Sequence, residues 1–143
     1  MDIINKDFLG SNTNGYHQVL VPEYPKKILL GIEEDTCNLS CPKCLVFGTN
    51  KDPNFDIKQV ATSSMPMNEV TKILREIKGH DTAITPSFWV EPLVAKQFKQ
   101  VLVEAKRENV PVAICTNGLL INGSMAEFLV GHTGVISVSI DAT

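Results

Sequence analysis

The sequence predicts an α/β fold with a parallel sheet, because short apolar runs alternate with one-sided amphipathic segments. Four runs rich in β-branched and aliphatic residues indicate strands, at 27–32, 83–90, 112–115 and 135–140. Three segments with helical spacing separate these runs. Polar motifs follow the first three runs, at the edge of a parallel sheet where α/β folds place their chemistry.

The three helices are expected to have local start and stop signals. The first carries apolar residues at i, i+3, i+4 and i+7, with Asn68 as its N-cap and Gly79 as its stop. The second covers 94–109 as one amphipathic helix. Ser124 and Glu127 match a capping box, which predicts that a short third helix opens there.

Composition and charge exclude several classes of protein. The 143 residues are 43% hydrophobic and 20% charged, which is typical of one soluble globular domain and argues against disorder. The net charge of −3 gives no broad basic surface for nucleic acid. The sequence shows neither a secretory signal nor an apolar run long enough to span a bilayer, so we expect no membrane partner and a cytoplasmic location.

The chain divides into an irregular lead-in at 1–25, with a short strand at 17–21, and a folded part at 26–143. The sequence stops directly after the fourth strand. A parallel sheet that ends there has an exposed edge. We therefore expect a fold truncated after its fourth strand, and a chain that is marginally stable or associates with itself.

Three of the four cysteines lie within eight residues, as Cys37-Asn-Leu-Ser-Cys41-Pro-Lys-Cys44. In a reducing compartment such clusters are metal ligands more often than disulfides. Thiolates suit iron–sulfur clusters and zinc. Three ligands on a short loop leave the fourth iron of a cubane cluster open to a small molecule. The remaining cysteine, Cys115, is expected to be a buried strand residue.

With this motif the sequence resembles the radical S-adenosylmethionine (radical SAM) family. The resemblance spans roughly residues 27–141 and depends on four motifs in the family's order. They are the cysteine loop, Trp89-Val90-Glu91-Pro92-Leu93 like the family's Gly-Gly-Glu-Pro, Thr116-Asn117-Gly118-Leu119-Leu120 like its Thr-Asn-Gly-x-Leu, and Ser137-Val138-Ser139-Ile140-Asp141 like its Val-Ser-Ile-Asp.

The resemblance implies a parallel-sheet partial (β/α) barrel and two cofactors, a 4Fe–4S cluster and S-adenosylmethionine. It implies that the open iron chelates the methionine group and that a one-electron reduction breaks the C5′–S bond. The resulting 5′-deoxyadenosyl radical would abstract hydrogen from a substrate, a peptide or a small molecule. It also implies a reducing partner such as flavodoxin or ferredoxin.

The resemblance also implies roles for individual residues. The cluster ligands would be Cys37, Cys41 and Cys44. Val90 and Glu91 would approach the methionine amino group, because carbonyls and a carboxylate suit an ammonium. The candidates near the methionine carboxylate and ribose are Thr116, Asn117, Ser137, Ser139 and Asp141.

Two positions depart from the family pattern. Trp89 and Val90 replace two glycines that allow a ligand to approach the backbone. Lys43 occupies a position that usually holds an aromatic residue near the adenine. We expect the bulky pair to weaken binding of S-adenosylmethionine.

Other interpretations stay open from the residues alone. Zinc could replace the cluster if Cys115, His17, His80 or His132 supplied a fourth ligand. The chain could be a non-catalytic iron–sulfur or zinc-binding module on a degenerate α/β scaffold, or a simple electron-transfer protein. Glu91 could serve only as a helix cap before Pro92.

Overall fold

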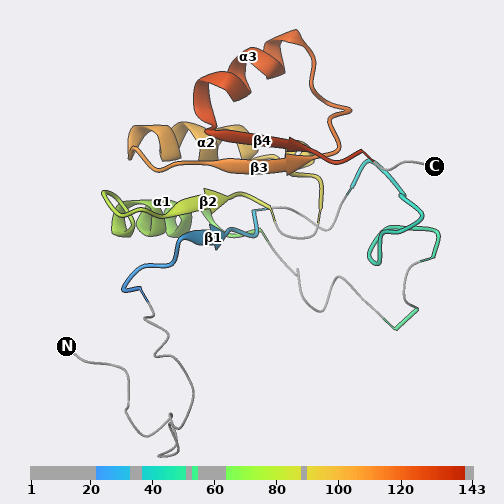
Figure 1. Ribbon diagram of the computed structural model, residues 1–143, viewed down its shortest axis with the longest axis horizontal. Coiled ribbons are helices and arrows are strands. Elements are labelled where there is room, and N and C mark those ends of the chain that lie inside the picture. The colour runs from blue at the N-terminus through green and yellow to red at the C-terminus, as the bar shows by residue number, and fades with distance from the viewer. Residues whose placement is uncertain (1–21, 33–36, 51–52, 55–63, 88–89, 141–143) are drawn as a thin grey trace, which may run out of the picture.

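The computed structural model describes residues 22–32, 37–50, 53–54, 64–87 and 90–140. These residues form strands and helices in the predicted alternating order (Figure 1). The strands are β1 (Lys27–Leu29), β2 (Ala83–Thr85), β3 (Ala113–Thr116) and β4 (Val135–Val138). The helices are α1 (Met67–Glu76), α2 (Phe98–Arg107) and α3 (Gly123–His132), and a 3-10 turn, η3 (Pro92–Val94), precedes α2. The strand expected at 17–21 lies outside the described residues.

The strands are parallel, as predicted. β1 pairs with β2, and β3 pairs with β4. In the described part of the chain, a single bridge between Ile84 and Val112 joins the two pairs. The structure is therefore a small α/β fold with short parallel strands, and closure into a partial barrel stays a prediction.

The hydrophobic core lies between one face of the strands, here called the outer face, and the helices α1 and α2. Leu30, Ile84 and Ile114 are buried on this face, where alternate strand residues point toward the helices. The helices fill the layer with side chains at helical spacing. Their fully buried members are Val70, Leu74, Phe98, Val101, Leu102 and Ala105.

An ion network joins the ends of α1 and α2. Glu108 follows α2 and lies 3.0 Å from the Lys78 ammonium, 3.5 Å from Arg107 and 3.6 Å from Arg75. The hydrogen bond from Lys78 lowers the pKa of the Glu108 carboxyl below its usual range, although partial burial opposes this shift. The network therefore stabilises the helix pair while Glu108 is ionised.

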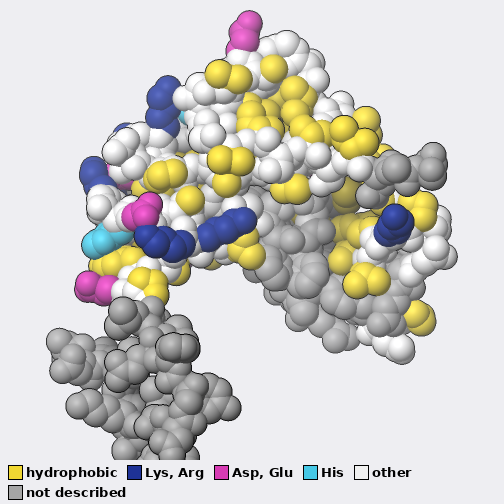
Figure 2. All heavy atoms as spheres, in the orientation of Figure 1, with side chains coloured by type: hydrophobic (Ala, Val, Ile, Leu, Met, Phe, Trp, Pro, Cys, Tyr) yellow, Lys and Arg dark blue, Asp and Glu magenta, His cyan; other side chains and the backbone are white. Residues whose placement is uncertain are grey.

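β4 lies at one edge of the strand order with its four residues exposed. Figure 2 shows hydrophobic side chains gathered over the part of the surface formed by α3 and β4, where Val130, Val135 and Val138 are exposed. This agrees with the predicted exposed sheet edge. No helix within the described ranges is long and apolar enough to cross a membrane.

Two predicted helix caps are wrong. α1 begins at Met67 because Pro66 is extended at the cap position, and Asn68 lies inside the helix with its side chain donating to Glu69. α3 begins at Gly123, because Asn122 Oδ1 accepts the Met125 N–H at 2.9 Å. The capping box of Ser124 and Glu127 is therefore displaced by an Asn cap two residues earlier.

The predicted helix at 94–109 is divided. Pro92 starts the short turn η3, and the chain is extended at Ala95 before α2 begins. The end near Asn109 is confirmed, since Asn109 has a left-handed φ of 57°. Gly79 likewise has a φ of 81° just beyond α1. The strand predicted at 83–90 ends at Thr85, because Pro86 has no N–H for the ladder.

Candidate functional site

A cavity of about 380 Å³, here called the inner cavity, opens on the face of the strands opposite the core. The cysteine loop (residues 37–48) lies beside it, at the side toward which the arrows of β3 and β4 point in Figure 1. Its walls combine this loop with residues of β1, β2 and β3 and with Ser139, which follows β4. The lining residues are Lys27, Leu29, Cys37, Leu39, Cys41, Thr85, Ser87, Val90, Glu91, Cys115, Thr116, Asn117 and Ser139.

Seven of the predicted site residues therefore line one cavity, although they come from all four motifs. Cys44 and Ser137 do not line it. Ser137 is exposed on β4, opposite Cys115 in the register. Trp89 and Asp141 lie outside the described residues, so the expected effect of the bulky pair on ligand binding stays a prediction.

Backbone hydrogen bonds within the cysteine loop hold it in a tight turn. The Cys44 N–H donates to the Cys41 carbonyl at 2.9 Å, and the Gly48 N–H donates to the Cys44 carbonyl at 3.1 Å. A Cβ added at Gly48 would lie closer than 3.0 Å to both of these carbonyl oxygens. Only glycine therefore fits this position without moving the backbone.

The donor set of the loop fits an iron–sulfur cluster by its chemistry. The thiols of Cys37, Cys41 and Cys44 are free and partly exposed. The Phe47 N–H lies 3.3 Å from Cys44 Sγ, and hydrogen bonds of this kind tune the potential of cluster sulfurs. Among the described residues, no three Cys, His, Asp or Glu side chains gather in a metal-binding arrangement. The ligand assignment therefore stays a proposal.

The buried Glu91 carboxylate ties the end of β2 to the end of β3. Its Oε1 accepts the Thr116 hydroxyl at 2.6 Å and the Leu93 N–H at 3.2 Å. Its Oε2 accepts the Asn117 N–H at 2.7 Å. Glu91 also caps η3 with Pro92 in the first position, as the cap interpretation expected. About one of the four acceptor positions of the carboxylate stays free for a ligand.

Asn117 anchors the cysteine loop to the turn after β3. Its Nδ2 donates to Asn38 Oδ1 at 2.7 Å, and its Oδ1 accepts the Leu119 N–H at 3.0 Å. Asn38 lies directly after Cys37, so this bond holds the first cysteine against the strands. Both polar groups of the Asn117 side chain are thus used within the protein.

The prediction that Cys115 is buried is wrong. Cys115 lies on β3 as expected, but it is exposed, with its Sγ 3.2 Å from Ser139 Oγ. The reason is strand alternation, because its neighbours Ile114 and Thr116 are buried while Cys115 points to the inner cavity, which Thr116 reaches only at the end of β3. The two described histidines have other partners, since His80 stacks on Tyr24 and His132 stacks on Phe128.

Lys27, Thr85 and Ser87 line the inner cavity and were missed by the sequence analysis. The period of two along each strand could have found the first two. Lys27 shares a strand face with Leu29, and Thr85 shares one with Ala83, opposite the buried Ile84. Ser87 lies beyond the end of β2, and its Oγ donates to the Val90 carbonyl at 2.7 Å.

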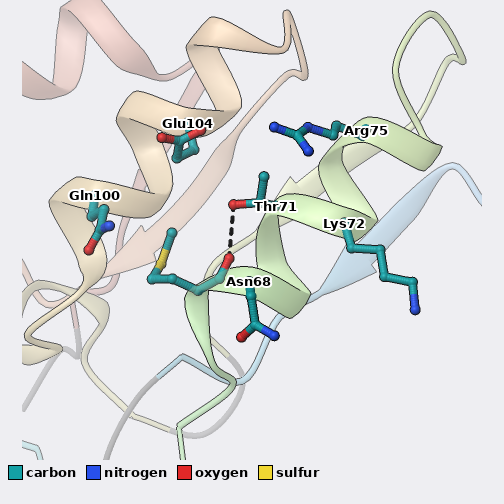
Figure 3. A pocket seen from close by; sticks show the side chains of 7 residues that line it. Asn68, Thr71, Lys72, Arg75, Gln100 and Glu104 are labelled. Atoms are coloured by element: carbon teal, nitrogen blue, oxygen red, sulfur yellow. Dashed lines mark hydrogen bonds between the residues drawn. The ribbon is translucent and has the colours of Figure 1, made fainter.

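A separate groove of about 410 Å³ lies between α1 and α2. Figure 3 shows polar and charged side chains from the two helices around it, including Arg75 and Glu104, with the Thr71 hydroxyl bonded to the Met67 carbonyl at 2.9 Å. It contains none of the motif residues. Seven of the predicted site residues thus line the inner cavity, and none lines this groove.

Comparison of the sequence with models of protein families gives no match, and comparison with curated proteins gives none either. Solved structures do resemble the chain. The crystal structure of BtrN in complex with AdoMet and 2-DOIA matches with a TM-score of 0.63 at 19% identity, over 86% of this chain and 48% of BtrN.

Streptococcus suis SuiB bound to S-adenosylmethionine matches with a TM-score of 0.56 at 21% identity, over 82% of this chain and 25% of SuiB. SuiB bound to its precursor peptide SuiA gives the same TM-score at 19% identity. The chain thus spans about half of BtrN and a quarter of SuiB. At these identities the likeness shows the fold alone.

Proposed function

We propose that this chain is part of a radical SAM enzyme whose 4Fe–4S cluster is bound by Cys37, Cys41 and Cys44. The inner cavity carries this proposal, because two thiols of the cysteine motif line it together with residues of the three other motifs. The fold likeness to two proteins with bound S-adenosylmethionine supports the same conclusion.

When bound and reduced, the cluster would supply one electron to the sulfonium of S-adenosylmethionine, which yields a radical that removes hydrogen from a substrate. The chain's own residues hold and orient the reactants. Asn117 fixes the cysteine loop through Asn38, and the Phe47 N–H stabilises negative charge on Cys44 Sγ. Glu91 offers its free acceptor position to the methionine ammonium.

The other residues proposed to contact S-adenosylmethionine differ in whether their polar groups are still available to a ligand. Ser139 lines the inner cavity with a hydroxyl that can bind the methionine carboxylate or the ribose. The Thr116 hydroxyl already donates to Glu91, so it offers a ligand only an acceptor. The Val90 carbonyl already accepts the Ser87 hydroxyl. The roles of Ser137 and Asp141 stay predictions.

The substrate class has two candidates in the structural neighbours. BtrN is in complex with AdoMet and 2-DOIA, and SuiB is bound to the precursor peptide SuiA. We keep both a small molecule and a peptide as proposals for this chain. A reducing partner such as flavodoxin or ferredoxin, and a cytoplasmic location, also stay proposals.

Anaerobic reconstitution tests the proposed function. We expect the chain to take up about four irons with matching sulfide, and S-adenosylmethionine to change the electron paramagnetic resonance spectrum of the reduced cluster. Cys41→Ala should abolish cluster uptake, because two thiolates remain. Cys115→Ser is the matched control, since Cys115 lies outside the motif, and it should retain the cluster.

Other results would contradict the proposal. Four irons in the Cys41→Ala variant would reject the ligand assignment. Loss of the cluster in the Cys115→Ser variant would favour a site with four thiolates and an electron-transfer role. Uptake of one zinc ion, with no iron–sulfur spectrum, would favour the zinc-binding module.

A further inference from the structure

The inner cavity contains two polar groups that the four motifs do not explain. In the parallel pairing of β1 and β2, Lys27 lies opposite Ala83, and Leu29 lies opposite Thr85. Ile84, between Ala83 and Thr85, is fully buried on the outer face. Strand alternation therefore places Lys27 and Thr85 on the same inner face, two residues apart along the strand direction.

Thr85 has a hydroxyl with no partner. The residue is 8% exposed, and its Oγ1 makes no hydrogen bond within the described part of the chain. By contrast, the buried Thr82 hydroxyl donates to the Pro25 carbonyl at 2.7 Å. A buried, unpaired hydroxyl costs free energy. Thr85 lines the cavity, so a change of its χ1 angle to another staggered position would let the hydroxyl donate to a ligand there.

Lys27 is a cation for which the described part of the chain provides no counter-charge. The neighbouring Lys26 is paired with Asp81, outside the inner cavity. Lys27 lines the cavity and makes no ion pair with any described residue. Of these two adjacent lysines at the start of β1, Lys26 is therefore neutralised, while Lys27 has no ion pair within the described residues.

The other polar groups of the cavity already have partners. Glu91 is the one carboxylate among the lining residues, and it accepts three hydrogen bonds from the chain. Ser87 donates to Val90, and Cys115 is bonded to Ser139. Apart from the groups proposed for the cluster and S-adenosylmethionine, the described lining residues thus leave the Lys27 ammonium without an ion pair and the Thr85 hydroxyl without a hydrogen bond.

We propose that Lys27 and Thr85 bind an anionic oxygen group, a carboxylate or phosphate, that belongs to the substrate of this cavity. An ammonium group and a hydroxyl are both donors to such a group, and the hydrogen bonds of the ammonium are charge-assisted. The inference depends on the proposed function only in assigning the anion to the substrate. Binding of the anion itself needs neither cluster nor S-adenosylmethionine.

Titration of the full chain, without cluster, with inorganic phosphate and with acetate tests the anion site. We expect saturable NMR shifts at the amides of Lys27 and Thr85. Lys27→Met should weaken binding by about tenfold or more, because a charged hydrogen bond is lost. Lys26→Met is the matched control and should leave the affinity unchanged. Absence of saturable shifts with both anions, or equal losses in the two variants, would overturn the proposal.

The role of the hydroxyl is tested by two variants of Thr85. Thr85→Ser keeps a hydroxyl and should bind the anion nearly as well as the parent chain. Thr85→Val keeps the shape without the hydroxyl and should bind it several-fold more weakly. Equal affinity in both variants would remove Thr85 from the anion site.

The source of the anion is tested after reconstitution, because S-adenosylmethionine also carries a carboxylate. We expect Lys27→Met to leave the affinity for S-adenosylmethionine unchanged, as judged by the cluster's electron paramagnetic resonance signal. A matching loss of phosphate and S-adenosylmethionine binding would instead assign Lys27 to the methionine carboxylate and overturn the substrate assignment. Failure of the cluster to form would reject the proposed function but leave the phosphate result intact.

Discussion

The two faces of the strands differ in how many of their side chains are packed or hydrogen-bonded within the chain. The outer face is closed, because Ile84 and Ile114 pack against buried side chains of α1 and α2. The inner face is open, and the described residues leave free thiols on it, a hydroxyl without a hydrogen bond and an ammonium group without an ion pair. The difference teaches that one face carries the stability of the fold, while the other is available for chemistry.

The largest effect should come from removing a large side chain from the core that covers the outer face. Phe98 is 1% exposed, so Phe98→Ala should lower the free energy of unfolding by about 3–5 kcal/mol. Leu29 is 44% exposed on the inner face, and Leu29→Ala should cost less than about 1 kcal/mol. Urea denaturation of the two variants measures the contrast. Equal losses would show that both faces support the fold.

The next effect concerns the cysteine loop. In Gly48→Ala the new methyl group would collide with the carbonyls of Cys41 and Cys44, at a cost of about 1–3 kcal/mol of strain. We therefore expect this variant to retain less iron after reconstitution. Gly31→Ala is the control, because a Cβ there meets nothing within 4 Å. Equal iron content in the two variants would show that the loop tolerates the change.

A smaller effect separates two buried threonines. Thr82→Val leaves the Pro25 carbonyl without its donor and should destabilise the chain by about 1 kcal/mol. Thr85→Val removes a hydroxyl that has no partner, so it should be neutral or slightly stabilising. Thermal denaturation compares the two variants. A clear loss of stability in Thr85→Val would mean that its hydroxyl supports the fold, and the two faces would differ less than described.

The smallest effect concerns pH and the Glu108 network. Because the folded chain lowers the Glu108 pKa, this carboxylate stabilises the fold above its ordinary pKa of about 4.3. That contribution should disappear as the pH falls through the lowered folded-state pKa. Glu108→Gln should therefore flatten the acid side of the stability profile, measured by urea denaturation at several pH values. The exposed Glu76→Gln is the control and should leave the profile unchanged.

The order of strands and helices was predictable from the sequence, because apolar spacing reports which residues pack against the core. The ends of the elements were less predictable. Asn122 and Ser124 both satisfy the statistics of an N-cap, and only the path of the chain before α3 decides between them. Pro92 likewise starts its own short turn, which a continuous apolar pattern conceals.

The candidate site was predictable where a motif marks it. Glu91 and Asn117 were identified from their motifs, and they meet in the structure through a hydrogen bond of 2.7 Å. Lys27 and Thr85 carry no motif. The period of two along each strand predicts which face they share, but their position relative to each other depends on the register between β1 and β2, which a single sequence does not reveal.

The bond between Asn38 and Asn117 joins residues 79 positions apart, and this separation sets an order of events during synthesis. At about 5–20 residues per second, a ribosome makes Asn117 roughly 4–16 s after Asn38. The nascent cysteine loop therefore emerges long before its anchor exists. Until then the three thiols lie on an untethered segment, so the proposed cluster is expected to bind stably only after β3 has left the ribosome.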